Sequence, residues 1–166
     1  MEKVLDAFTT SLTRPQIKYT LMVNRLFSLD IRAMAYVTAE RLQTDRLAVK
    51  FNGPGLIEIG SLVAEKLALE LVGTGRAELA GFVDKQEIVL RGLGQYEAAN
   101  LESRVAKIEL LGPGVATLWA TKQLDVSVRG PGSVSYYGAP EVRQRISPMG
   151  NLVCLESRSV NETVRV

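Results

Sequence analysis

Three glutamates are the residues of this sequence whose type and spacing come closest to a chemical site. Glu58, Glu78 and Glu97 recur at intervals of 20 and 19 residues. If they lie side by side, their oxygens could bind Ca²⁺, which takes several oxygen ligands, or two of them could serve as the acid and base of a glycosidase. A solvated acidic face is the simpler expectation, because two carboxylates ~4.8 Å apart in water repel by only about 0.9 kcal/mol. The same periodic position elsewhere holds Thr38, Thr117 and Ser135.

The composition rules out several other kinds of site. The 166 residues include no histidine and 1 cysteine, so Ser-His-Asp and Cys-His nucleophiles, internal disulfides and cysteine-rich zinc sites are excluded. A total of 20 Lys and Arg against 18 Asp and Glu gives a net charge of +2, which predicts no strong attraction to nucleic acid or to an anionic membrane. No apolar run approaches the ~20 residues of a membrane-spanning helix. We therefore expect a protein that is not an enzyme and that uses no cofactor or metal.

Three arginines could line a groove for a polyanion. Arg32, Arg91 and Arg129 each stand just before a Gly-X-Gly triplet or a degenerate copy of one. Val72 and Leu111 hold the same place before two other triplets and interrupt the series. Because the row of cations is broken, we expect no nucleic acid partner.

Three aromatic residues could stack on sugars and provide a glycan-binding surface: Tyr36, Trp119 and Tyr137. Aromatic residues make up only 6% of the chain, so packing at corners is the expectation that we favour. The single cysteine, Cys154, is expected to be a small buried hydrophobe rather than a reactive thiol.

Apolar residues in the middle of the Gly-X-Gly triplets, or beside them, are the candidates for an interaction surface. They share an outward position at an exposed corner or on the flanking strand. They could be scattered surface hydrophobes, or extra packing under the N-terminal segment. The alternative is a contiguous apolar edge that docks a protein partner or another copy of the chain. The candidate residues are Met34, Pro54, Leu56, Val72, Leu93, Leu111, Pro113, Val115, Pro131 and Met149.

These residues take their spacing from an internal repeat. The first glycines of the triplets follow one another at steps of 20, 19, 20 and 18 residues, and degenerate copies stand at 33–35 and 148–150. Glycine supplies positive φ or room for close backbone approach, so each triplet predicts a corner between two strands. The triplets begin at Gly53, Gly73, Gly92, Gly112 and Gly130.

Apolar residues occupy fixed positions relative to each triplet, at the spacing of two that is typical of a strand. Four residues before its first position stand Leu29, Val49, Leu69, Ile88, Ile108, Val126 and Gln144, and two before it stand Ile31, Phe51, Leu71, Leu90, Leu110, Val128 and Ile146. Four and six residues after it stand Val37, Ile57, Ala77, Tyr96, Ala116, Val134 and Leu152, then Ala39, Ile59, Leu79, Ala98, Leu118, Tyr136 and Cys154. Nine after it stand Leu42, Leu62, Phe82, Leu101, Thr121 and Ala139. We call each such set of equivalent residues a file, and we predict that the side chains of each file point inward.

The repeat predicts an all-β fold, a β-solenoid (parallel β-helix) of about six to seven coils of ~19 residues. Each strand would stack on its counterpart in the next coil at ~4.8 Å. A leucine-rich repeat is disfavoured because its asparagine ladder is missing, and a helical repeat because glycine pairs would break it. We divide the chain into an N-terminal cap or partial coil at 1–25, the solenoid domain at 26–157, and a C-terminal tail or last strand at 158–166.

The two ends differ from the repeat. Ile17 and Tyr19 match the inward phase of an earlier, incomplete coil. Residues 1–13 could form a short helix or strand that caps it. The ends of a solenoid carry unpaired strand edges that need cover, so a cap is expected there.

The last coils resemble a known family. The segment Leu124-Asp-Val-Ser-Val-Arg-Gly-Pro-Gly-Ser-Val-Ser-Tyr-Tyr-Gly-Ala-Pro-Glu-Val, followed by Ile146-Ser-Pro-Met-Gly, is similar to the end of the "putative auto-transporter adhesin, head GIN domain" family. In that family, coils of strand, Ser-Gly-X-Gly and strand recur, and V-x-Y-x-G-x-P precedes a final Ile-Ser-Gly-X-Gly. The likeness spans about residues 26–155. It implies a β-helical domain, usually exported to the bacterial envelope, with no known catalytic residues.

We expect a structural or adhesive role, in which repeated outward side chains meet a protein or cell-envelope surface and many weak contacts add. Two alternatives stay open: a self-assembling, bactofilin-like filament or lattice subunit, and a polysaccharide-binding or polysaccharide-active β-helix. The resemblance implies the cell envelope or the extracellular space. The start of the chain, where Asp6 closely follows Lys3, does not predict a signal peptide, so a cytoplasmic location is also open.

Overall fold

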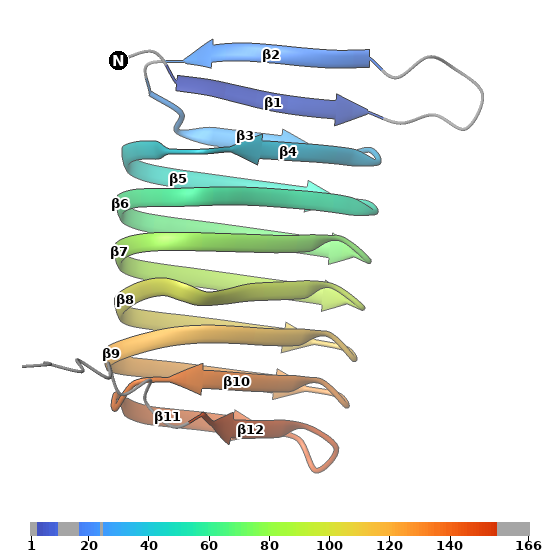
Figure 1. Ribbon diagram of the computed structural model, residues 1–166. Coiled ribbons are helices and arrows are strands. Elements are labelled where there is room, and N and C mark those ends of the chain that lie inside the picture. Colours follow the sequence, from blue (N-terminus) through green and yellow to red (C-terminus); the bar gives the residue numbers. More distant parts are fainter. Residues whose placement is uncertain (1–2, 10–16, 24, 156–166) are drawn as a thin grey trace, which may run out of the picture.

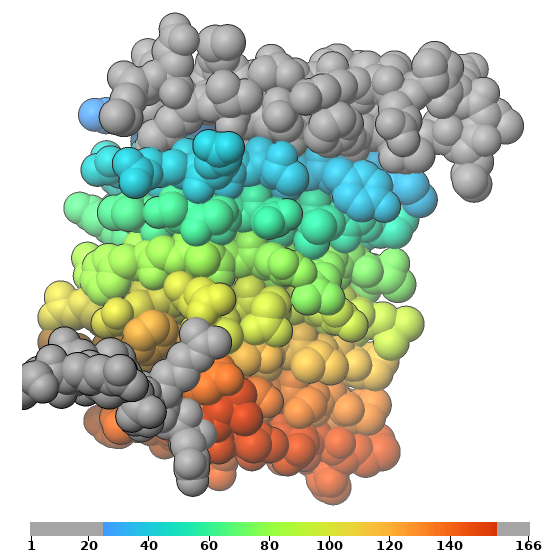
Figure 2. Space-filling model, in the orientation of Figure 1, coloured from blue at the N-terminus to red at the C-terminus, as the bar shows by residue number. Residues whose placement is uncertain are grey.

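The computed structural model describes residues 3–9, 17–23 and 25–155, and within these ranges the chain forms strands and loops without a helix. The strands wind into a parallel β-solenoid of about seven turns, each lying on the one before (Figure 1). Successive turns form successive bands of side chains along the molecule (Figure 2). The predicted fold class is confirmed. Because each turn contacts only its neighbours, a repeated residue meets its own counterparts.

The solenoid has two sheet faces. Face A contains the whole of β4, β10 and β12 together with the first half of each of the strands β6 to β9. Face B contains the whole of β3, β5 and β11 together with the second half of each of the strands β6 to β9. The long strands bend from face A into face B, and the Gly-X-Gly corners return the chain to face A (Figure 1). The strands are β1 (Lys3–Thr9), β2 (Ile17–Val23), β3 (Ser28–Ile31), β4 (Ala35–Ala39), β5 (Leu42–Asn52), β6 (Gly55–Gly73), β7 (Arg76–Gly92), β8 (Gln95–Leu111), β9 (Val115–Arg129), β10 (Ser133–Tyr137), β11 (Glu141–Ile146) and β12 (Asn151–Cys154).

Equivalent apolar residues stand above one another inside the solenoid. Val49 pairs with Leu69, and Leu69 pairs with Ile88, in the parallel register of β5, β6 and β7. Ile108 and Val126 continue the same file on β8 and β9. All five side chains are buried in one continuous core. The sequence period therefore corresponds to the physical turn, as predicted.

The two glycines of a corner are needed for different reasons. Gly73 has φ of +102°, a left-handed backbone conformation that other residues adopt only with strain. Gly75 lies outside that region, but a Cβ atom there would stand 2.5 Å from Cε1 of Phe51 on the preceding turn. In this corner the first glycine turns the chain, and the second lets the backbone pass directly over a core side chain.

The file predicted nine residues after the first position of each triplet is partly wrong. Leu62 pairs with Gly81 rather than with Phe82, and Phe82 is exposed on the outer surface. Thr121 is half-buried and Ala139 is exposed. The cause is a set of register shifts in β6, β7 and β8 where these strands bend from face A to face B. Because a bulge adds residues to one strand, the same number of residues after a glycine no longer places a side chain on the same side of the strand.

The predicted burial of Cys154 is also wrong. Cys154 pairs with Tyr136 and so lies in the inward file, but its side chain is exposed. Gln144 on β11 is exposed in the same way. Both residues belong to the last described turn, and no further described turn covers them.

The N-terminal strands form an antiparallel arrangement on the first turn. β1 pairs with β4 on one side and with β2 on the other, and both pairings are antiparallel. Ile17 and Tyr19 lie on β2 and pair with β1, so they do not extend the parallel files of the coils. The edge of β4 is thereby covered by a strand. The C-terminal tail predicted at 158–166 lies outside the described residues.

A buried polar network interrupts the apolar core. The Tyr96 hydroxyl donates to Oε1 of Gln86 at 2.7 Å, Nε2 of Gln86 donates to Oγ of Ser103 at 2.8 Å, and Ser103 donates to the Trp119 carbonyl at 2.7 Å. Complete burial raises the pKa of Tyr96, so its hydroxyl stays a donor. Gln86 occupies a position that other turns fill with Leu47, Leu67, Ala106 and Leu124.

This network gives a stability prediction. Tyr96→Phe leaves the Gln86 carbonyl without its donor, and Gln86→Leu leaves the Tyr96 hydroxyl without its acceptor. Each variant should lose about 1–3 kcal/mol of unfolding free energy, the cost of a buried group left unpaired. The double variant should lose clearly less than the sum, because both orphaned groups are then absent. Urea unfolding of the four proteins measures this, and strictly additive losses would contradict the coupling.

Candidate binding surface

The ten apolar candidates lie along the edge of the solenoid formed by the Gly-X-Gly corners. We call these residues the corner stripe: Met34, Pro54, Leu56, Val72, Leu93, Leu111, Pro113, Val115, Pro131 and Met149. The middle residues of the triplets are all exposed, from 37% for Met34 to 60% for Leu93 and 71% for Met149. Val115 is 46% exposed, whereas Leu56, Val72 and Leu111 are half-buried. Thr74 is the polar member of the corner series.

Charged side chains interrupt the two files of the corner stripe that flank the triplets. On face B, Val72 and Leu111 share their file with Arg91, whose Nε lies 3.3 Å from a carboxylate oxygen of Glu70. On face A, the file of Leu56 and Val115 also contains Arg76, which forms a 2.6 Å ion pair with Glu78. The middle residues of the triplets carry no charge, and charged side chains flank them on both faces. An uncharged centre with a polar rim is the arrangement of a protein interface.

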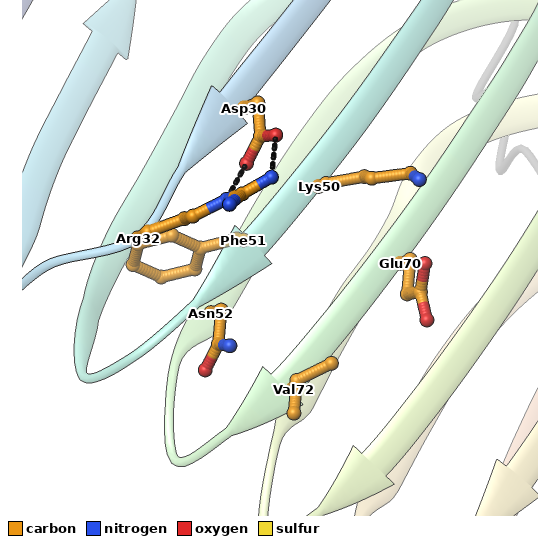
Figure 3. A pocket seen from close by; sticks show the side chains of 7 residues that line it. All are labelled: Asp30, Arg32, Lys50, Phe51, Asn52, Glu70 and Val72. Carbon is orange, nitrogen blue, oxygen red and sulfur yellow. Dashed lines mark hydrogen bonds and ion pairs between the residues drawn. The ribbon is translucent and has the colours of Figure 1, made fainter.

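Arg32 is held by a neighbouring carboxylate. Its Nε and Nη2 atoms donate to the two carboxylate oxygens of Asp30 at 3.3 and 3.0 Å (Figure 3). These hydrogen bonds lower the pKa of Asp30 below its ordinary value. The residues line a shallow hollow of about 220 Å³ together with Lys50 and Glu70 from the next two turns. Because charges of both signs lie close together, the hollow has no strong preference for an anion.

The other two arginines of the predicted row are also paired. Arg91 contacts Glu70, and Arg129 lies 3.9 Å from Glu109 of the preceding turn. A larger hollow of about 470 Å³ lies beside β11 and was not singled out from the sequence, because its files mix both signs. Its charged lining residues are Lys107, Glu109, Asp125, Arg129, Arg143 and Arg145.

The glutamates do stack as a ladder on face A, where Glu58 is exposed and Glu78 and Glu97 are half-buried. Glu58 pairs with Glu78, and Glu78 with Glu97, in the strand register; Thr117 continues the file. Glu78 is held by Arg76. Within the described turns, no group of three or more metal-ligating side chains converges on a point.

The structure brings two of the three aromatic candidates together and separates the third. Trp119 pairs with Tyr137 on adjacent strands, and both are half-buried at the bend where face A passes into face B. Tyr36 lies at the opposite end of face A, beside Leu56 of the corner stripe. Phe82 joins the first group, and sequence reasoning missed it because the bulge moves it from the expected inward position to the surface.

Comparison with protein families identifies the fold's relatives. The model of the family "putative auto-transporter adhesin, head GIN domain" matches residues 4–140. The chain belongs to this family. Comparison with curated proteins gives no match. The described part of this head GIN domain contains no helix long and apolar enough to cross a membrane.

Solved structures of similar proteins share the head GIN solenoid. A putative adhesin from Bacteroides fragilis is 28% identical, with a TM-score of 0.79, and the match covers 83% of this chain and 65% of that one. Putative adhesins from Parabacteroides distasonis and Parabacteroides merdae are 22% and 20% identical, with TM-scores of 0.69 and 0.68, and show the fold alone. These matches cover 78% of this chain and 55% and 54% of the other two, so the head GIN domain spans little more than half of their length.

Proposed function

We propose that this head GIN domain is a non-catalytic, adhesin-like module that binds a protein partner at the cell envelope through its corner stripe. The observation that carries the proposal is the alignment of ten apolar residues along one edge, with the triplet residues exposed at the corners. The family and the similarity to putative adhesins support an adhesive role.

The geometry explains how such a surface could work without a pocket. Each turn contributes a small apolar contact, and the turns repeat at ~4.8 Å. Contacts that are individually weak add when they are held on one rigid body, because the entropy of ordering is not lost again for each of them. The ion-paired arginines and glutamates at the border would favour a protein partner with a polar rim of its own.

A matched pair of valines tests the proposal. Val115 in the corner stripe is 46% exposed, and Val153 on β12, outside the corner stripe, is 38% exposed. The probe is intact cells of Bacteroides fragilis, the source of the 28% identical putative adhesin. We expect labelled protein to bind these cells saturably, and proteinase treatment of the cells to abolish this binding. Val115→Asp should weaken binding at least about tenfold, since a charge at the centre of an apolar contact is desolvated without a partner. Val153→Asp should leave the binding unchanged.

Three outcomes would contradict the proposal. Equal binding by wild type and Val115→Asp would remove the corner stripe from the contact. Binding that survives proteinase treatment would exclude a protein partner. Sedimentation velocity of the chain alone supplies the third outcome: a dimer or polymer that Val115→Asp dissociates would identify the occupant as a second copy.

A further inference from the structure

A second surface lies at the bend opposite the corner stripe. We call it the aromatic strip: Val63, Phe82, Glu102, Trp119 and Tyr137. These five residues form one file across β6 to β10, because each pairs with the next in the parallel register. Val63 and Phe82 are exposed, at 43% and 38%, and the other three are half-buried. Three of the five are aromatic in a chain that has 6% aromatic residues.

A hollow of about 140 Å³ lies beside this strip on face A. Strand alternation places Ala80 and Phe82 on the same side of β7, about 7 Å apart. The floor of the hollow contains Gly60, Ala80 and Ala99, which leave space above the sheet, and Asn100 lies at its border. Its other side is lined by the glutamate ladder of Glu58, Glu78 and Glu97.

The bulges of the solenoid create this arrangement. Between Ala98 and Glu102, β8 has extra residues that β9 lacks, so Trp119 follows directly after the partner of Ala98. The register of β7 against β8 also shifts here, and Ala80 pairs with Asn100. As a result, the lining of the hollow ends at β8, and Trp119 stands on β9 directly after Leu118, the partner of Ala98. Bulges re-aim side chains in this way and are frequent beside functional sites.

We propose that the hollow and the aromatic strip bind a neutral oligosaccharide. The apolar faces of sugar rings would lie against Phe82 and Trp119, as apolar ligand surfaces do on exposed aromatic rings. The carboxylates of the glutamate ladder and the side chain of Asn100 would hydrogen-bond sugar hydroxyls, and the same carboxylates would repel an acidic glycan. The hollow has the size of a single sugar ring, and the adjacent rings extend the contact to neighbouring sugars. This site is separate from the protein contact proposed for the corner stripe.

Tryptophan fluorescence tests the inference directly, because Trp119 is the only tryptophan in the chain. We would titrate the protein with the hexasaccharides of β1,4-linked glucose, mannose and N-acetylglucosamine. A saturable change in emission is expected with at least one of them, in the millimolar range or tighter. Phe82→Ala should weaken that affinity at least about tenfold, and thermal unfolding should show the variant to be folded. Tyr36→Ala is the matched control, since Tyr36 is also an exposed aromatic residue, at 43% against 38% for Phe82. Its loss should leave the sugar affinity unchanged.

Several outcomes would overturn the inference. Absence of a saturable signal with all three hexasaccharides would exclude the site, as would equal affinity of wild type and Phe82→Ala. A response to nona-lysine without a response to sugars would identify a site for cationic peptides instead. Val115→Asp should leave the sugar titration unchanged, so failure of the corner-stripe proposal and failure of this one are distinguishable.

Discussion

Leu90→Lys should prevent folding, whereas Val89→Lys on the same strand should leave stability unchanged or slightly raised. Leu90 is completely buried in the file that contains Leu71 and Leu110. An ammonium group there would have no partner, and a buried unpaired charge costs more than about 4 kcal/mol, a large part of the 5–15 kcal/mol that stabilises a typical domain.

Both variants introduce a lysine on the same strand, but one position is buried and the other faces outward. Val89 points outward and stands between Glu70 and Glu109 in the strand register. A lysine there would meet opposite charges across two strands, which contributes about 0.2–1 kcal/mol. Circular dichroism and urea unfolding of both variants measure the difference. Similar stability of the two variants would contradict the inward file.

Gly75→Val should strongly destabilise the corner that it occupies. The new side chain would collide with the ring of Phe51, and its Cβ would also stand 3.0 Å from the carbonyl oxygen of Gly53. Both groups lie on the preceding turn, and a stacked coil cannot move away without losing its ladder of hydrogen bonds. Overpacking of this kind costs about 1–3 kcal/mol, and the branched side chain places the loss at the upper end or above.

Thr74→Val provides the control for this experiment. Thr74 lies in the same corner, its side chain is exposed, and valine has nearly the same shape. The expected change in unfolding free energy is within about 0.5 kcal/mol. A loss at position 74 as large as that at position 75 would mean that the corner tolerates no change at all, rather than that the second glycine is required by the core beneath it.

The periodic part of the fold could be predicted from the sequence because the same pattern of glycines and apolar residues occurs once in every turn. The files of Val49 and of Phe51 could be predicted because inward residues alternate along each strand and the triplets recur every 18 to 20 residues. The position of the corner stripe could be predicted from the same spacing, because a residue between two corner glycines must lie outside the core.

The bend and the ends could not be predicted in this way. The turns differ by one or two residues, and the structure absorbs the difference in bulges that put Phe82 on the surface and the half-buried Gly81 opposite Leu62. Gln86 breaks the apolar file, and its partners come from positions 10 and 17 residues away, which no local pattern indicates. Cys154 is exposed because burial in a solenoid depends on the next turn and not on the phase of the residue alone.

The most direct test of the stacked register measures distances along the corner stripe. Pulsed electron paramagnetic resonance would use pairs of spin labels in a Cys154→Ser background, at positions 74 and 149, four turns apart, and at 34 and 149, six turns apart. With turns spaced at ~4.8 Å, the separations should be about 19 and about 29 Å, plus the reach of the labels. Distances that do not increase with the number of turns would contradict the stacked coils, and with them the continuous surface that they present.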